Sequence, residues 1–172
     1  ILGKRSGFEG KTTPQFEEVL KNINQDVNIK NTDKFDENAQ KEFLKGAKIA
    51  YETIITDFSD HDNKLIKSKS LLSKKIQDQF NEALKERSNK GHYAEITFIG
   101  VNSADIKEHK KTNSILKVTV DFVAEVITCI KDKDKKIISG DPEKIKKIYD
   151  TWVFSRDTTS TNPNWQLVNI LT

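Results

Sequence analysis

Apolar residues recur at helical spacing in the first clearly patterned stretch of the chain, which begins at Asn38. The residues at steps of three and four are Phe43, Ala47, Ala50, Tyr51, Ile54 and Phe58. That spacing places them on one face of a helix. A second helix is predicted to run to Lys90, with Gly91 as its stop, and its apolar stripe comprises Ile76, Phe80, Ala83 and Leu84.

After Gly91 the period of the apolar positions changes from that of a helix to that of a strand. The clearest example is "SILKVTVDFVAEVITCI", where every second residue from Leu116 to Val126 is apolar and Lys117, Thr119 and Asp121 stand between them. Such alternation is typical of a strand with one buried face. At about 3.3 Å per residue the strand is roughly 50 Å long, so the sheet must bend strongly.

Three further strands are predicted around it, in "HYAEITFIGVNSADI", "KIYDTWVFSRD" and "NWQLVNIL". The connections are "KEHKKTN", "KDKDKKIISGDPEK" and "TTSTNP". Gly140-Asp141-Pro142 is interpreted as a turn, with strand from about Lys147. The last strand is apolar on both faces, as an interior strand is. Helices followed by a curved antiparallel sheet predict an α+β fold in which the helices cover one face of the sheet.

Residues 1–36 show no sustained apolar period and are interrupted by Gly3, Gly7, Gly10 and Pro14. We expect a mobile N-terminal arm here and the folded domain over 37–172. The sequence starts at Ile1 and contains no methionine, so we expect that a segment upstream, such as a membrane anchor, was removed.

The composition, with 35% hydrophobic and 32% charged residues, is that of a globular domain, and the formal net charge is +3. The positive residues are nearly all lysine and are spread along the chain, whereas nucleic-acid binding needs a concentrated basic face. No nucleic-acid partner is therefore expected. The lone Cys129 rules out an internal disulfide and favours a reducing compartment.

The residues that could carry chemistry are few. His61, His92 and His109 stand near predicted turns without metal-ligand spacing, so we expect no metal site and no cofactor. A curved sheet under helices could also hold an isomerase-like site with an aspartate base in an apolar cavity. The candidates would be Asp121, Asp150 and Tyr149, of which Asp150 shares a face with Trp152 and Phe154. An ordinary ion pair is the alternative for Asp150.

A lysine-rich segment without acidic residues follows the first helix, with Lys64, Lys67, Lys69, Lys74 and Lys75 among Leu65, Ile66, Leu71 and Leu72. It could lie on an anionic membrane, where each lysine contributes about 1 kcal/mol. Alternatively it is a solvated surface whose leucines point into the core.

Two stretches carry family motifs. "GDPEKIKKIYDTWVFSRDTTSTNPNWQLVNI" combines a Gly-Asp-Pro turn, a Trp-x-Phe-x-Arg-Asp strand and an Asn-Pro-Asn-Trp-x-Leu strand entry. Upstream, "FLKGAKIAYETIITDFSDHDNKLIKSKSLLS" has a Gly-Ala-x-x-Ala-Tyr helix, an acidic turn and Leu-Leu-Ser. In these motifs Asn38 to Thr172 resemble the Tim-forty-four-like domain family. The start "ILGKRSG" resembles the basic stretch after the membrane helix of bacterial members.

This resemblance implies a cone-shaped α+β fold of the nuclear-transport-factor-two-like kind, with a deep apolar pocket and no catalytic residues. We expect the pocket to be lined by Phe98, Phe122, Trp152, Phe154 and Trp165. The basic residues expected to face the membrane are Lys4, Arg5, Lys64, Lys67 and Lys69.

The resemblance also implies partners and a location. Mitochondrial members sit on the matrix face of the inner membrane, bind cardiolipin-rich lipid and hold a heat-shock chaperone at the presequence translocase. Bacterial members are inner-membrane adaptors. The sequence has no counterpart of the long N-terminal region of the mitochondrial protein, so we expect a bacterial adaptor on the cytoplasmic face, with the matrix face as the alternative. Its partners would be anionic lipid and a membrane or translocation-related protein.

Overall fold

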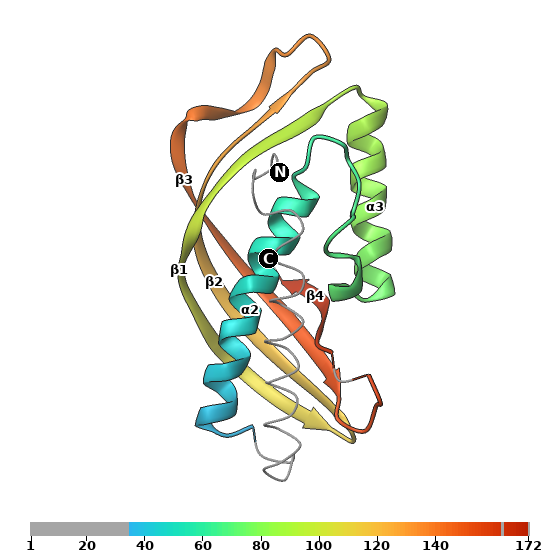
Figure 1. Cartoon of the computed structure of the whole chain (residues 1–172), viewed down its shortest axis with the longest axis vertical. Helices are drawn as coiled ribbons and strands as arrows, with labels where there is room; N and C mark the ends of the chain where they lie inside the picture. Colours follow the sequence, from blue (N-terminus) through green and yellow to red (C-terminus); the bar gives the residue numbers. More distant parts are fainter. Residues whose placement is uncertain (1–34, 163, 172) are drawn as a thin grey trace.

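The computed structural model describes residues 35–162 and 164–171, which form two α-helices and a four-stranded antiparallel sheet (Figure 1). The predicted α+β order is confirmed. The predicted arm, apart from its last two residues, lies outside the described residues. The elements are α2 (Glu37–Phe58), the short 3-10 helix η1 (Lys69–Leu71), α3 (Lys74–Asn89), β1 (Tyr93–Thr112), β2 (Ile115–Lys131), β3 (Ile137–Asp157) and β4 (Gln166–Leu171).

The sheet has the strand order β1-β2-β3-β4 and curves around α2, which lies along its concave face (Figure 1). The apolar stripe predicted for the first helix faces the sheet: Phe43, Tyr51 and Ile54 are at most 2% exposed. The alternating residues of β2 from Leu116 to Val126 are buried beneath them. The core therefore joins one face of α2 to one face of the sheet, as the sequence pattern predicts, and Leu71, Leu72 and Ile76 from η1 and the start of α3 complete it.

Local capping residues define the helix ends. Asp36 accepts a hydrogen bond from the backbone N–H of Ala39 and caps α2, and Ser73 does the same for α3 through Ile76. The predicted stop at Gly91 is confirmed, because this residue adopts a φ of 71° just after α3. Phe35, at the end of the predicted arm, is buried against Phe43, so the core starts no later than this residue.

Bulges account for the predicted bending of the sheet. Against β2, strand β1 carries three single extra residues, which fall at Ile99, Asn102 and Lys107. Each such bulge bends its strand and increases the local twist. The connection between β1 and β2 is correspondingly shorter than predicted, because β1 continues to Thr112 and includes His109.

Strand β3 begins about ten residues before the predicted start at Lys147, and the prediction of a turn at Gly140-Asp141-Pro142 is wrong. These residues lie inside β3, at a large bulge. Val126 of β2 pairs with Lys146 of β3, and Thr128 of β2 pairs with Asp141. Residues 142–145 of β3 are therefore the extra residues of the bulge. Gly140 has a φ of 80°, and a Cβ at this position would stand 2.5 Å from the carbonyl oxygen of Thr128. The glycine is thus required by the strand pairing rather than by a chain reversal.

The last strand was predicted to be interior, but within the described residues β4 is at the edge of the sheet, next to β3 only. Its two-sided apolar pattern has another cause. Val168 is an extra residue opposite the Val153–Phe154 step, and the far side of the strand is partly covered. Leu72 forms a parallel bridge with Leu167, and the N–H of Ser73 donates to the Leu167 carbonyl at 2.9 Å.

Candidate functional site

The lysine-rich segment, residues 64–75, comprises the loop after α2, the short helix η1 and the first two residues of α3, and one buried carboxylate fixes the backbone of the loop. Asp57, in the last turn of α2, is 5% exposed. It accepts hydrogen bonds from the backbone N–H groups of Ile66, Lys67 and Ser68 and from the Ser68 hydroxyl, at 2.6 to 3.2 Å. Charge-assisted hydrogen bonds of this kind are about twice as strong as neutral ones. The start of the segment therefore has a defined conformation.

The guanidinium group of Arg87 holds the residues that connect α2 to this loop. Arg87 of α3 donates to the Asn63 side chain at 2.6 Å and to the Phe58 carbonyl at 2.9 Å, and so satisfies the C-terminal end of α2. Asn63 has a φ of 58° and also donates to the His92 carbonyl. Burial lowers the pKa of Arg87, an effect that nearby Asp60 opposes.

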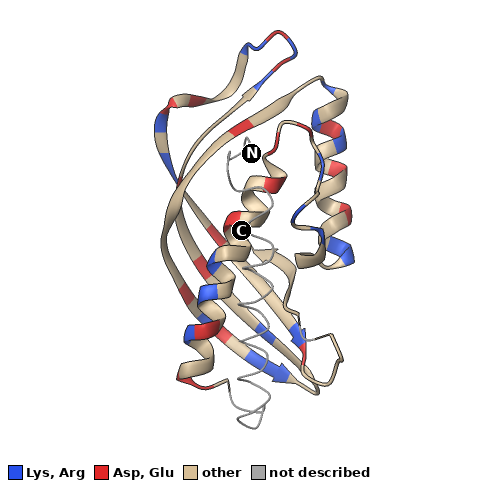
Figure 2. Ribbon diagram, in the orientation of Figure 1, with Lys and Arg blue, Asp and Glu red and all other residues tan. Residues whose placement is uncertain are grey.

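The side chains of the segment divide between core and surface. Leu71 and Leu72 are buried, and Leu65 packs against the core, as one of the two interpretations of the segment predicts. Ile66 differs from them, because 63% of its surface is exposed. Lys64 and Lys69 are exposed beside it, and Lys67 is half-buried. In Figure 2 the lysines of this segment appear in blue on the loop and at the start of α3. Lys4 and Arg5, the other basic residues expected at the membrane, lie outside the described residues.

The five aromatic residues expected to line a pocket are all at most 3% exposed. Phe122 stacks on Tyr51 with ring centroids 4.3 Å apart, and Trp152 lies 4.6 Å from the same ring. Phe154 and Trp165 border a hollow of about 10 Å³, the space of about one water molecule. The structure thus places these rings in the packed core under α2. Phe98 also contacts Tyr51; a role for the five in ligand binding stays a prediction.

Asp150, the carboxylate singled out in the sequence, meets a tyrosine. The hydroxyl of Tyr51, which is fully buried, donates a hydrogen bond to Oδ2 of the half-buried Asp150. Burial, and then the charge of Asp150, raises the pKa of Tyr51, so the phenol stays protonated. The pair joins α2 to β3. Of the other two candidates, Asp121 accepts from the Thr151 hydroxyl at 2.6 Å, and Tyr149 is 71% exposed.

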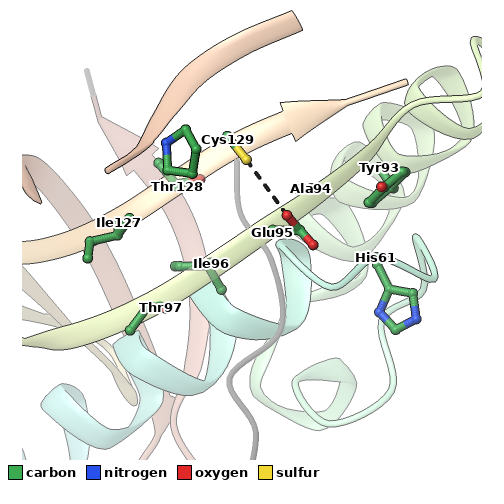
Figure 3. Close-up of a pocket in the computed structure, with 10 residues that line it drawn as sticks. His61, Tyr93, Ala94, Glu95, Ile96, Thr97, Ile127, Thr128 and Cys129 are labelled. Carbon is green, nitrogen blue, oxygen red and sulfur yellow. Dashed lines mark hydrogen bonds between the residues drawn. The ribbon is translucent and has the colours of Figure 1, made fainter. Parts of the chain in front are cut away.

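Two hollows lie at the end of the sheet farthest from Trp165. One, of about 750 Å³, is bordered by Ile55 of α2, by β2 from Thr128 to Ile130, and by the first part of β3 down to Asp150. The other, of about 510 Å³, is bordered by His61, Pro142 and facing residues of β1 and β2. In Figure 3 the Cys129 thiol of this second hollow points toward Glu95, with 3.9 Å between Sγ and Oε1.

The Cys129 thiol and two of the histidines each lie beside another side chain. Burial raises the pKa of Cys129, and the Glu95 charge adds to the effect, which opposes thiolate formation. Cys129 is 2% exposed and lies opposite Glu95 of β1. His61 lies 2.9 Å from Asp60, and His109 packs on the ring of Phe35. Within the described residues no group of three histidine, cysteine or acidic side chains could hold a metal ion.

Sequence reasoning missed the residues that organise the loop, namely Asp57, Asn63 and Arg87. A signal was present in part: Asp57 is a polar residue beside the apolar stripe of α2, and Arg87 is one of only three arginines. The contacts nevertheless join residues 9 to 29 positions apart, and no periodicity reports such pairs.

Comparisons with known proteins give a family and a distant structural neighbour. The profile of the Tim44-like domain family matches residues 26–172. No curated protein matches the chain. Among solved structures, the intermembrane space region of chloroplast protein ARC6 aligns over 95% of this chain and 97% of its own, at 10% identity and a TM-score of 0.37. At that score the alignment does not bear on function.

Proposed function

The chain belongs to the Tim44-like domain family, and from that premise we propose that it is a non-catalytic, membrane-associated adaptor. It binds anionic lipid through the segment of residues 64–75 and a protein partner connected with translocation through the rest of its surface. We place it at the inner membrane, facing the bacterial cytoplasm, with the mitochondrial matrix face as the alternative. Family membership supports association with an inner membrane and a role in translocation.

The observation that carries the lipid proposal is the exposed Ile66 among lysines on a fixed loop. Three nearby lysines, Lys64, Lys67 and Lys69, would contribute about 1 kcal/mol each at an anionic surface, and insertion of one isoleucine side chain about 2 kcal/mol. Together these terms give weak, reversible binding. Among the described residues no helix has the length and apolar character needed to cross a bilayer.

The test is sedimentation of the full chain with vesicles of phosphatidylcholine alone or with added phosphatidylglycerol. Binding should require phosphatidylglycerol and weaken as salt rises, because charges are screened over about 8 Å at physiological ionic strength. Substituting Lys64→Gln and Lys69→Gln should lower the partition coefficient roughly thirtyfold, or by about 2 kcal/mol. Equal binding to neutral vesicles would contradict the electrostatic part of the proposal.

A matched control is available on the helices. Lys41 of α2 and Lys85 of α3 are exposed, and Lys41→Gln with Lys85→Gln removes the same charge from other surfaces. This pair should change vesicle binding much less than the loop pair. If both pairs reduce binding equally, net charge rather than the loop governs the interaction. Ile66→Ser should weaken binding while leaving the salt dependence unchanged.

The contact between Tyr51 and Asp150 favours one second candidate, a small-molecule site of the isomerase kind. Asp150 borders the hollow of about 750 Å³ and could accept a proton from carbon beside a carbonyl group, with its orientation held by Tyr51. The test is deuterium exchange into β,γ-unsaturated ketones, followed by NMR. Exchange that disappears in Asp150→Asn would replace the non-catalytic proposal; the adaptor function predicts none above the buffer rate.

A further inference from the structure

Strand β3 has a long backbone edge without a neighbour among the described residues. It pairs with β2 from Ile137 to Asp141 and from Lys146 to Asp157, with the bulge of residues 142–145 between these parts, whereas β4 pairs with β3 only from Thr151 to Ser155. The part of β3 from Ile137 to Asp150 thus has a strand on one side only. In the bulge the N–H of Glu143 donates to the Asp141 carboxylate at 2.9 Å, and no backbone–backbone hydrogen bond outside the sheet ladder involves residues 137–150 within the described chain. Some of their N–H and C=O groups therefore point away from β2 without a partner in the described part of the chain.

This edge borders a space large enough for an extended segment. The hollow of about 750 Å³ has Ile55 and Ile130 in its wall and the β3 residues Lys144, Lys146 and Ile148 along its rim. It lies just past Leu171, where β4 ends opposite Thr151. An additional strand here would extend along β3 beyond the end of β4; Figure 1 shows the two strands.

The side chains at the edge indicate what could bind. The stretch "KIKKIYD" from Lys144 to Asp150 has three lysines and one acidic residue, and that residue accepts the Tyr51 hydrogen bond. Lysines alone could serve to protect an exposed edge from self-association. Protection does not explain Ile145 and Tyr149, however, which are 59% and 71% exposed on the same stretch. Apolar contact and positive charge together fit a ligand that is both apolar and acidic.

We propose that β3 binds an extended, acidic peptide segment of a protein partner, which adds to the sheet as a strand alongside Lys146–Asp150. The backbone of the segment pairs with the free edge. Its apolar side chains enter the hollow over Ile55 and Ile148, where Lys146 stands at the rim, and its acidic side chains lie on the opposite face beside Lys147. Strand addition of this kind derives affinity from the main chain and specificity from alternate side chains. The inference rests on the proposed adaptor function, of which it names the protein-binding site; it does not depend on lipid binding.

The probe is a fluorescein-labelled peptide of about eight residues with alternating glutamate and valine, a length typical of strands. The full chain should bind it saturably in fluorescence anisotropy. The same peptide with every second amide N-methylated keeps its charge but loses backbone donors, and should bind at least about tenfold more weakly. A peptide of alternating lysine and valine should not bind. Chemical-shift changes should map to β3 before Thr151 and to Ile55.

Two triple variants separate the edge from general electrostatics. Lys144→Glu, Lys146→Glu and Lys147→Glu should weaken binding of the acidic peptide at least about tenfold. The control reverses Lys107, Lys110 and Lys117, which are exposed on β1 and β2, and should have a much smaller effect. Equal losses in the two variants, or equal affinity for the N-methylated peptide, would leave only charge attraction and overturn the proposal. So would the absence of saturable binding.

The remaining outcomes distinguish this proposal from the others. The edge variant should still bind vesicles that contain phosphatidylglycerol, and Lys64→Gln with Lys69→Gln should still bind the acidic peptide. Vesicle binding that fails in the wild type while peptide binding persists would reject the lipid proposal alone. A wild-type dimer that dissociates in the edge variant, measured by analytical ultracentrifugation, would assign the edge to a second copy of the chain and overturn the peptide proposal.

Discussion

The two halves of strand β3 are both rich in large apolar residues, yet their environments are opposite. In the second half Trp152 and Phe154 are at most 3% exposed. In the first half Ile137, Ile138 and Ile145 are 44% to 59% exposed. The second half lies beneath α2 and beside β4, whereas the first half extends past both (Figure 1). Burial in this fold is therefore decided by which element covers a strand, and not by how apolar the strand is.

The two halves of β3 also border hollows of very different volume. Around Trp165 the core leaves a hollow of about 10 Å³, whereas the first half of β3 borders one of about 750 Å³. The Tyr51–Asp150 hydrogen bond stands at the boundary between them. We infer that the closed half supplies most of the stability and that the open half is the region available to partners.

The largest expected effect comes from breaking the closed half. Trp165 is 3% exposed and contacts Phe43 and Phe35. Trp165→Ala should lower the free energy of unfolding by about 3 to 5 kcal/mol, a large share of the roughly 5 to 15 kcal/mol of a domain. A chain that begins at Thr32 keeps Phe35 and should lose little. If thermal unfolding shows the truncation to be more damaging, the predicted arm and the importance assigned to the C-terminal aromatic residues are both wrong.

An intermediate effect is expected in the open half, at the β3 bulge. Gly140→Ala forces a side chain into a positive φ and against the Thr128 carbonyl, and should cost about 1 to 3 kcal/mol. A Cβ added at Gly100 would meet no atom within 4 Å, so Gly100→Ala should stay within about 0.5 kcal/mol.

Hydrogen exchange then sharpens the comparison for these two glycines. In Gly140→Ala the amides of the first half of β3 should exchange faster than in the wild type, while those beneath α2 stay protected. A uniform rise of exchange throughout the sheet would contradict the separation of the two halves. Equal losses of stability in the two variants would show that the close approach at Gly140 is unimportant.

The smallest effect is expected at the boundary, from Tyr51→Phe. Loss of the hydrogen bond to Asp150 should cost about 0.5 to 1.5 kcal/mol near pH 7, because Asp150 is half-exposed and water can replace the phenol. Urea unfolding at several pH values measures it. A cost above that range would indicate that the pair also organises the rings around it.

The pH dependence follows from the raised pKa of Tyr51. An unfolded tyrosine ionises near pH 10, whereas the buried phenol keeps its proton above that pH. Its contribution to stability is therefore complete below about pH 10 and is lost as the pH rises further, because the unfolded state alone releases the proton. The wild type should lose stability between pH 10 and 11 more steeply than Tyr51→Phe. Parallel curves would contradict the burial of this hydroxyl.

The parts of the fold that the sequence predicted are those set by local periodicity. The stripe from Phe43 to Phe58 and the alternation of β2 each need only one buried face, and both are confirmed. The start of β3 was misplaced because Gly140 and Pro142 are read as turn residues when only neighbours in sequence are considered. Here the glycine is required by Thr128, a residue of the adjacent strand. The edge position of β4 was missed for a similar reason, since its cover comes from Leu72.

The candidate site was predictable to a smaller extent. Composition singled out the lysines around Ile66, and the alternation of β3 placed Asp150 on the face of Trp152. Neither pattern could indicate that Tyr51, 99 residues away in sequence, would meet Asp150. The free edge of β3 depends on where β4 stops, which is a property of the strand pairing and leaves no periodic trace in the sequence.

The single-residue bulges of β1 make the chain respond differently to deletion and to substitution. Ile99, the extra residue of the first bulge, is 45% exposed, so exchanging it alters one solvent-facing side chain. Removing it would leave Phe98 opposite Val126 and Gly100 opposite Glu125, so the pairing would persist but the bend that the bulge gives to β1 would be lost. We therefore expect length differences among relatives to collect in the turns at Asn113 and at Asp132–Lys136, while the bulges keep their length even where their residue types vary.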